Sequence, residues 1–65
     1  MKTETFSAVV EATTEKAILL DFGDMKAWIP ISQIVDCDCK LDMLMKGDDI
    51  EVELPLWLAK EKELL

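Results

Sequence analysis

The stretch Ile50-Glu51-Val52-Glu53-Leu54 decides the fold class of this sequence. Its apolar and acidic residues alternate strictly, which is typical of a β-strand with one face on a core and the other in solvent. Lys46-Gly47-Asp48-Asp49 precedes it and has the composition of a turn, because Gly adopts turn conformations without steric cost. The sequence therefore predicts a strand over residues 50–54 whose solvent face is acidic.

Three more strands are predicted upstream of this one. They cover residues 3–14, 16–22 and 25–30. The turns between them fall at Thr13-Thr14-Glu15 and at Gly23-Asp24. In the first strand the alternation predicts a core face made of Phe6, Ala8, Val10 and Ala12. In the third strand it predicts that Trp28 lies on the face opposite Ala27 and Ile29.

The remaining segments connect and close these strands. Ile31–Ile34 is predicted to form a short turn that tucks both isoleucines under the sheet. Within Val35–Met45, residues 35–42 alternate apolar residues with Asp and Lys, which favours an extended segment at a sheet edge. Met43-Leu44-Met45, which ends this segment, is apolar and flexible. Pro55 is predicted to open a short C-terminal helix within residues 55–65, because Pro is favoured in the first helical turn.

Together these elements predict a mainly β fold in one small domain over residues 1–65. Short strands with tight turns expose edges unless the sheet closes. We therefore expect a five-stranded OB-like or SH3-like β-barrel with a short C-terminal α-helix. A chain of 65 residues has a small core. Pairing with a second copy as a homodimer is therefore an alternative way to stabilise the fold.

Three blocks of the sequence form an ordered set. They are Thr14-Glu15-Lys16-Ala17-Ile18-Leu19-Leu20, Trp28-Ile29-Pro30-Ile31-Ser32-Gln33-Ile34 and Pro55-Leu56-Trp57-Leu58-Ala59-Lys60-Glu61-Lys62. The set resembles a family of small phage and prophage proteins of unassigned function, and the match covers most of the chain. The resemblance implies a phage, mobile-element or bacterial origin and a shared fold, and it implies no catalytic residues.

The residue types present argue against an enzyme or a metalloprotein. The chain has no His to act as a general base, and Ser7 and Ser32 have no evident activating partner. Cys37 and Cys39 form a C-x-C pair, and two thiolates are too few for a structural zinc site within one chain. The Asp residues near them lack the Gly and Glu positions of a calcium-binding loop. We expect no enzymatic activity, no metal and no cofactor.

Charge and exposed apolar residues favour binding to another protein. The 14 Asp and Glu outnumber the 7 Lys and Arg, so the formal net charge is −7. A net charge this far from zero also keeps a small domain soluble. Rows of carboxylates suit a basic partner, as in acidic inhibitors of host defence nucleases of the anti-CRISPR or DNA-mimic type. The candidate partner-binding residues are Trp28, Asp36, Asp38, Met43, Met45, Asp48, Asp49, Glu51 and Glu53.

The alternative is an accessory protein that binds single-stranded nucleic acid during replication or recombination. Trp28 would then serve as a stacking platform beside nearby lysines. The negative charge and the absence of Arg argue against direct binding to phosphate. No segment has the apolar length of a membrane span or a signal peptide, so we expect the cytoplasm of a host bacterial cell.

Overall fold

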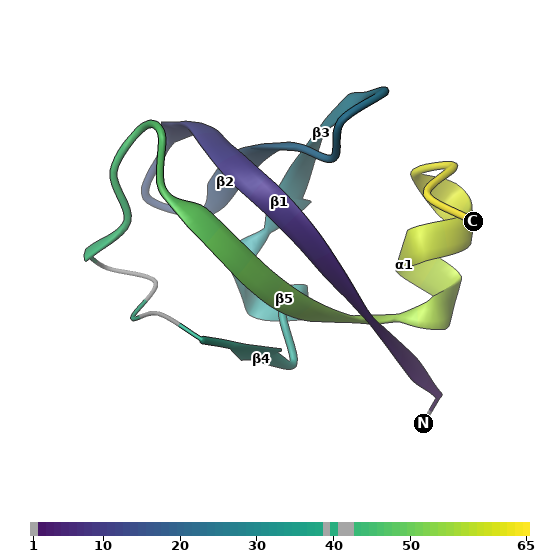
Figure 1. Ribbon diagram of the computed structural model, residues 1–65. Coiled ribbons are helices and arrows are strands. Elements are labelled where there is room, and N and C mark those ends of the chain that lie inside the picture. The colour runs from purple at the N-terminus through teal and green to yellow at the C-terminus, as the bar shows by residue number, and fades with distance from the viewer. Residues whose placement is uncertain (1, 39, 41–42) are drawn as a thin grey trace.

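The computed structural model describes residues 2–38, 40 and 43–65. In these residues it forms one five-stranded antiparallel sheet and one short helix, so the predicted mainly β class is confirmed. The elements are β1 (Thr3–Thr13), β2 (Ala17–Asp21), β3 (Lys26–Pro30), the 3-10 turn η1 (Ile31–Gln33), β4 (Asp36–Cys37), β5 (Asp49–Pro55) and α1 (Leu56–Glu61). The strand order is β3-β2-β1-β5-β4 (Figure 1).

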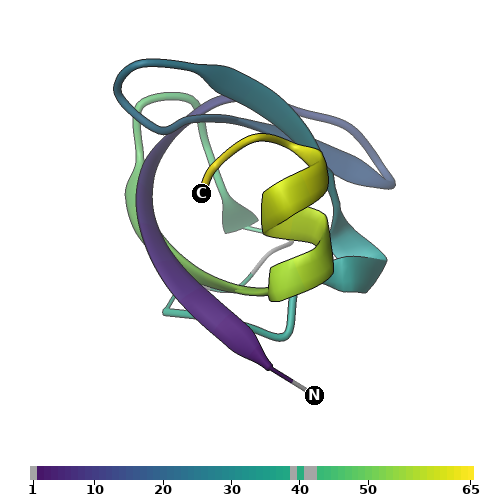
Figure 2. The same cartoon turned by 90° about the vertical axis from the view of Figure 1, so that its right-hand side faces the viewer.

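The sheet curls around its core but is not closed, because β3 and β4 remain its two edge strands (Figure 2). The barrel expected from the sequence is therefore not confirmed. α1 lies over one end of the curled sheet, and the loop that leads into β5 lies at the opposite end (Figure 1). Leu58 of α1 and Leu44 of that loop are both buried in the central cluster, so each end is sealed by an apolar side chain.

The core follows from the alternation along each strand. The largest of the almost completely buried side chains are those of Val10, Ile18, Leu20, Ile29, Val52 and Leu54. At one border of this cluster the rings of Phe6 and Phe22 meet edge to face, with centroids 6.0 Å apart. Ile31 and Ile34 pack against the cluster from η1 and the residue after it, as predicted.

A β-bulge in β1 overturns one prediction. Val10 lies opposite Leu20, but the next paired residue, Ala12, lies opposite Leu19, so Glu11 is an extra residue in the ladder. An extra residue reverses which face the following side chains occupy. Ala12 therefore shares the outer face with Leu19, whereas the strict alternation placed it on the core face.

Two predicted turns are confirmed, and both need glycine. Gly23 has φ +106° in the β2–β3 hairpin, and its amide donates to the Asp21 carboxylate at 2.8 Å. Gly47 has φ +95° in the turn before β5. Such positive φ values strain residues that carry a Cβ.

The extended edge segment predicted within residues 35–45 is confirmed at β4, where Asp36 and Cys37 form an edge strand of the sheet. Cys39, Leu41 and Asp42 of the same pattern lie outside the described residues. Further along, Leu44 turns inward while Met43 and Met45 remain exposed. The Asp36 carboxylate accepts from the adjacent Cys37 amide, whereas the Asp38 carboxylate accepts from the Glu51 amide of β5 and extends the contact between the two strands.

The predicted short C-terminal helix is confirmed, and it covers the first part of the expected range 55–65. Pro55 ends β5 in an extended conformation and α1 runs from Leu56 to Glu61. The helix is closed by Glu63, which has φ +60°, while the Leu64 amide donates to the Ala59 carbonyl at 2.8 Å. Leu64 then packs against the core.

Candidate functional site

The outer face of β4 and β5 gathers most of the predicted carboxylates. Along β5 the residues that alternate with the buried Ile50, Val52 and Leu54 project outward. On the neighbouring strand Asp36 lies opposite Glu53, and the Asp38 amide donates to the Glu51 carbonyl at 3.2 Å. We call this surface the acidic face; its residues are Asp36, Asp38, Asp49, Glu51 and Glu53.

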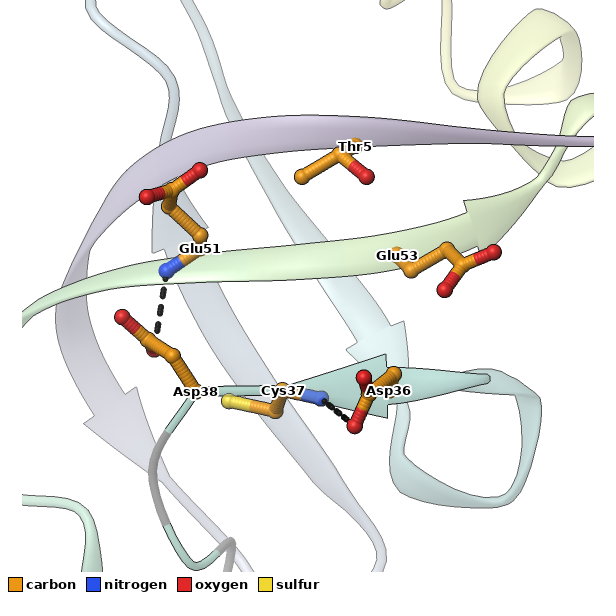
Figure 3. A pocket seen from close by; sticks show the side chains of 6 residues that line it. All are labelled: Thr5, Asp36, Cys37, Asp38, Glu51 and Glu53. Atoms are coloured by element: carbon orange, nitrogen blue, oxygen red, sulfur yellow. Dashed lines mark hydrogen bonds between the residues drawn. The ribbon is translucent and has the colours of Figure 1, made fainter.

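Local hydrogen bonds hold several of these carboxylates in place (Figure 3). The Asp38 carboxylate accepts from the Glu51 amide at 3.1 Å, and the Asp36 carboxylate accepts from the Cys37 amide at 2.9 Å. The hydroxyl of Thr3 donates to the carboxylate of Glu53. These bonds occupy one oxygen of each group and leave the other oxygens able to accept from a partner.

No described lysine neutralises the acidic face. Within the described ranges the one ion pair joins Lys26 of β3 to Glu11 of β1 at 3.7 Å, on a different part of the sheet. The carboxylates of the acidic face are therefore available to a cation from outside. In a strand, alternate side chains repeat every ~6.7 Å, so β5 presents charge at a regular spacing.

Two open hollows adjoin one another along this face. One has a volume of about 210 Å³ and is lined by Thr5, Asp36, Cys37, Asp38, Glu51 and Glu53. The other has a volume of about 300 Å³ and is lined by Ser7, Ala8, Asp38, Asp49, Ile50 and Glu51. Their linings supply hydrogen-bond acceptors, hydroxyls and one half-buried thiol. Among the described residues no group of His, Cys, Asp or Glu is arranged to hold a metal ion.

The other predicted partner-binding residues are not part of the acidic face. The Asp48 carboxylate accepts from the Met45 amide at 2.9 Å and so closes the turn before β5. Met43 and Met45 project from the loop that leads into this turn, with exposures of 69% and 71%. Trp28 is 44% exposed on β3, at the edge of the sheet farthest from β4.

The hydroxyl residues beside the acidic face are not among the predicted partner-binding residues. Thr5 lies opposite Glu53 and Ser7 lies opposite Glu51 on the adjacent strand β1. Their position on the polar side of an alternating strand was visible in the sequence. Their neighbours were not, because the pairing of β1 with β5 joins distant segments, from Thr3 with Pro55 to Val9 with Asp49.

Comparisons of the chain with models of protein families, with curated proteins and with solved structures find no match. The resemblance to small phage and prophage proteins thus stays a prediction from its sequence blocks. No helix in the described part of the chain has the length and apolar character needed to cross a membrane.

Proposed function

We propose that this protein is a non-enzymatic, protein-binding accessory of a phage or other mobile element. In this proposal the curled sheet is a small OB-like or SH3-like barrel domain that acts in the cytoplasm of a bacterial host. Its target is a protein with a basic surface. The most concrete form is an acidic inhibitor of a host defence nuclease complex, of the anti-CRISPR or DNA-mimic type.

The observation that carries the proposal is the acidic face. Its carboxylates come from two adjacent strands, point outward together and have no ion-pair partner among the described residues. Such a surface accelerates association with a basic protein and makes binding sensitive to salt. The same arrangement offers acceptors to Lys and Arg side chains that ordinarily contact nucleic-acid phosphates.

The flanking apolar residues suit the same role. Met43 and Met45 project into solvent on either side of the buried Leu44. Methionine side chains are flexible and polarizable, and they adapt to the shape of a partner surface. We propose that they add apolar contact area beside the charged contacts of the acidic face.

Charge reversal tests this proposal. Tagged wild-type protein and the double variant Glu51→Lys, Glu53→Lys are applied to nuclease-treated bacterial lysate at low salt. The matched control is Glu15→Lys, Glu61→Lys, which changes the net charge equally at exposed positions off the acidic face. We expect the wild type and the control to retain the same protein in stoichiometric amount, and the Glu51, Glu53 variant to lose it. Equal retention by all three proteins contradicts the proposal.

A second candidate function rests on Trp28. Its ring is partly exposed on β3, and the neighbouring Lys26 lies on the same face. Exposed aromatic rings beside lysine side chains can stack on single-stranded bases. This alternative predicts that labelled oligonucleotides bind the wild type and that Trp28→Ala abolishes binding while the fold is retained. It also predicts that capture from lysate disappears after nuclease treatment.

A further inference from the structure

The N-terminal half of β1 has a strand neighbour on one side only. β5 pairs with β1 from Thr3 to Val9, whereas the pairing with β2 starts at Val9 and continues to Thr13. β2 occupies the second side of β1 only from Val9 onward. On that side residues 3–8 have no strand neighbour and form a free sheet edge. In Figure 2 this part of β1 runs along the front of the molecule from the N-terminus.

Two hydrogen bonds show which backbone groups point out of this edge. The Leu56 amide donates to the Lys2 carbonyl at 3.0 Å, and the Val10 amide donates to the Asp48 carbonyl at 2.9 Å. The register between them is unbroken, and antiparallel backbone groups alternate between the two sides of a strand. The amides and carbonyls of Thr3, Thr5 and Ser7 thus point away from β5, and no described residue pairs with them.

The other edges of the sheet carry features that oppose pairing at some of their outward positions. On β4 the outward amide of Cys37 is already capped by the Asp36 carboxylate at 2.9 Å. On β3 Pro30 has no amide to donate, and Lys26 places a charge on the edge. The β1 edge has neither device at Thr3, Thr5 or Ser7, and the last two of these are exposed.

We propose that this edge binds an extended, basic segment of a partner protein by strand addition. This inference rests on the proposed function, because the charge of the acidic face selects the occupant. Thr5 lies opposite Glu53 and Ser7 lies opposite Glu51, so small hydroxyl side chains separate an added strand from these carboxylates. Figure 3 shows Thr5 beside the two glutamates.

The spacing suits lysine or arginine at alternate positions. An added strand lies ~4.8 Å from β1, and its outward side chains repeat every ~6.7 Å, the same repeat as the acidic residues of β5. Long cationic side chains pass over Thr5 and Ser7 to reach Glu53 and Glu51. The backbone bonds supply affinity, and the alternating charge supplies selectivity.

Two N-methylated peptides test this geometry. The probe is a capped peptide of alternating Lys and Val, whose affinity is measured by titration. In the proposed register each Lys lies opposite Thr3, Thr5 or Ser7 and donates its amide to β1. N-methylation of the Lys residues removes these bonds, whereas N-methylation of the Val residues leaves them. We expect the first change to weaken binding about tenfold or more and the second to have little effect. Equal affinity of the two N-methylated peptides overturns the proposal.

Hydrogen exchange provides a second readout on the unmodified protein. The Thr3, Thr5 and Ser7 amides should exchange quickly in the free protein and become protected when the peptide binds. Thr5→Pro should weaken peptide binding because it removes an outward amide, while Thr5→Val keeps the amide and should bind as the wild type does. If Thr5→Pro fails to fold, the peptide pair decides the question. Protection that appears in the free protein as its concentration rises assigns the edge to a second copy and overturns the proposal.

The proposed function and this inference can fail separately. If Glu51→Lys, Glu53→Lys abolishes peptide binding and the two N-methylated peptides bind equally, the acidic face stands and strand addition is wrong. If the N-methylated peptides differ and charge reversal has no effect, an edge site exists but its basic occupant is wrong.

Discussion

The Asp38 carboxylate accepts a hydrogen bond from the Glu51 amide at 3.1 Å, so a side chain closes the last contact between β4 and β5. The Asp38 amide completes the pair by donating to the Glu51 carbonyl at 3.2 Å. We predict that Asp38→Ala destabilises the protein by about 1 kcal/mol, because the net value of such a bond is of that order. Urea unfolding measures the loss, and faster hydrogen exchange at Glu51 locates it. Asp38→Asn keeps an acceptor oxygen and should stay near wild-type stability; an equal loss in both variants contradicts this role.

The helix terminus at Glu63 offers a stabilising substitution. Glu63 has φ +60°, and the amides of Glu63 and Leu64 close the helix onto Lys60 and Ala59. A side chain in this conformation costs about 1 kcal/mol relative to glycine. Glu63→Gly should therefore raise the free energy of unfolding by roughly that amount, as measured by thermal or urea denaturation. The control Glu61→Gly, within α1, should lower it by about 1 kcal/mol.

Leu44 should anchor the loop that carries the exposed methionines. It is buried in the core cluster, whereas Met43 and Met45 project outward. Leu44→Ala is expected to cost about 2–5 kcal/mol, as for other buried leucines, which approaches the whole stability of a small domain. Met43→Ala and Met45→Ala should each change stability by less than about 0.5 kcal/mol. Circular dichroism with thermal melting compares the three variants, and a harmless Leu44→Ala would contradict the anchoring role.

Thr3 and Thr5 form a matched pair for testing the bond to Glu53. The Thr3 hydroxyl donates to the Glu53 carboxylate, while Thr5 lies opposite the same residue across the ladder without such a bond. Thr3→Val should destabilise the protein by about 1 kcal/mol, and Thr5→Val by less than about 0.5 kcal/mol. A double-mutant cycle with Glu53→Gln measures the coupling energy between the two side chains. A coupling energy near zero for Thr3 would show that this bond does not stabilise the protein.

Strict alternation made β3 and β5 predictable from the sequence. In both strands one set of residues is buried and the other faces solvent, so the pattern alone gave their extent. It also placed Trp28 opposite Ala27 and Ile29, but which of these two faces is in solvent came from the structure. It failed at Ala12, because the extra residue at Glu11 reverses the faces without any change in residue type.

The candidate site was predictable in part for the same reason. Glu51 and Glu53 follow from the alternation within one strand, so their shared face could be read directly. Their neighbours Asp36 and Thr5 could not, since these contacts depend on which strands pair, and local periodicity does not encode pairing between distant segments. The separation of Trp28 from the acidic face likewise follows from the strand order.

The pairing of β1 with β5 also sets the order in which the chain can assemble. β1, β2 and β3 follow one another through short turns, so their contacts are local, whereas Thr3 must find Pro55 at the far end of the chain. Contacts between distant segments close slowly. During synthesis the residues of β1, β2 and β3 are made before those of β5, so the side of β1 that bonds to β5 stays uncovered until residues 49–55 have been made.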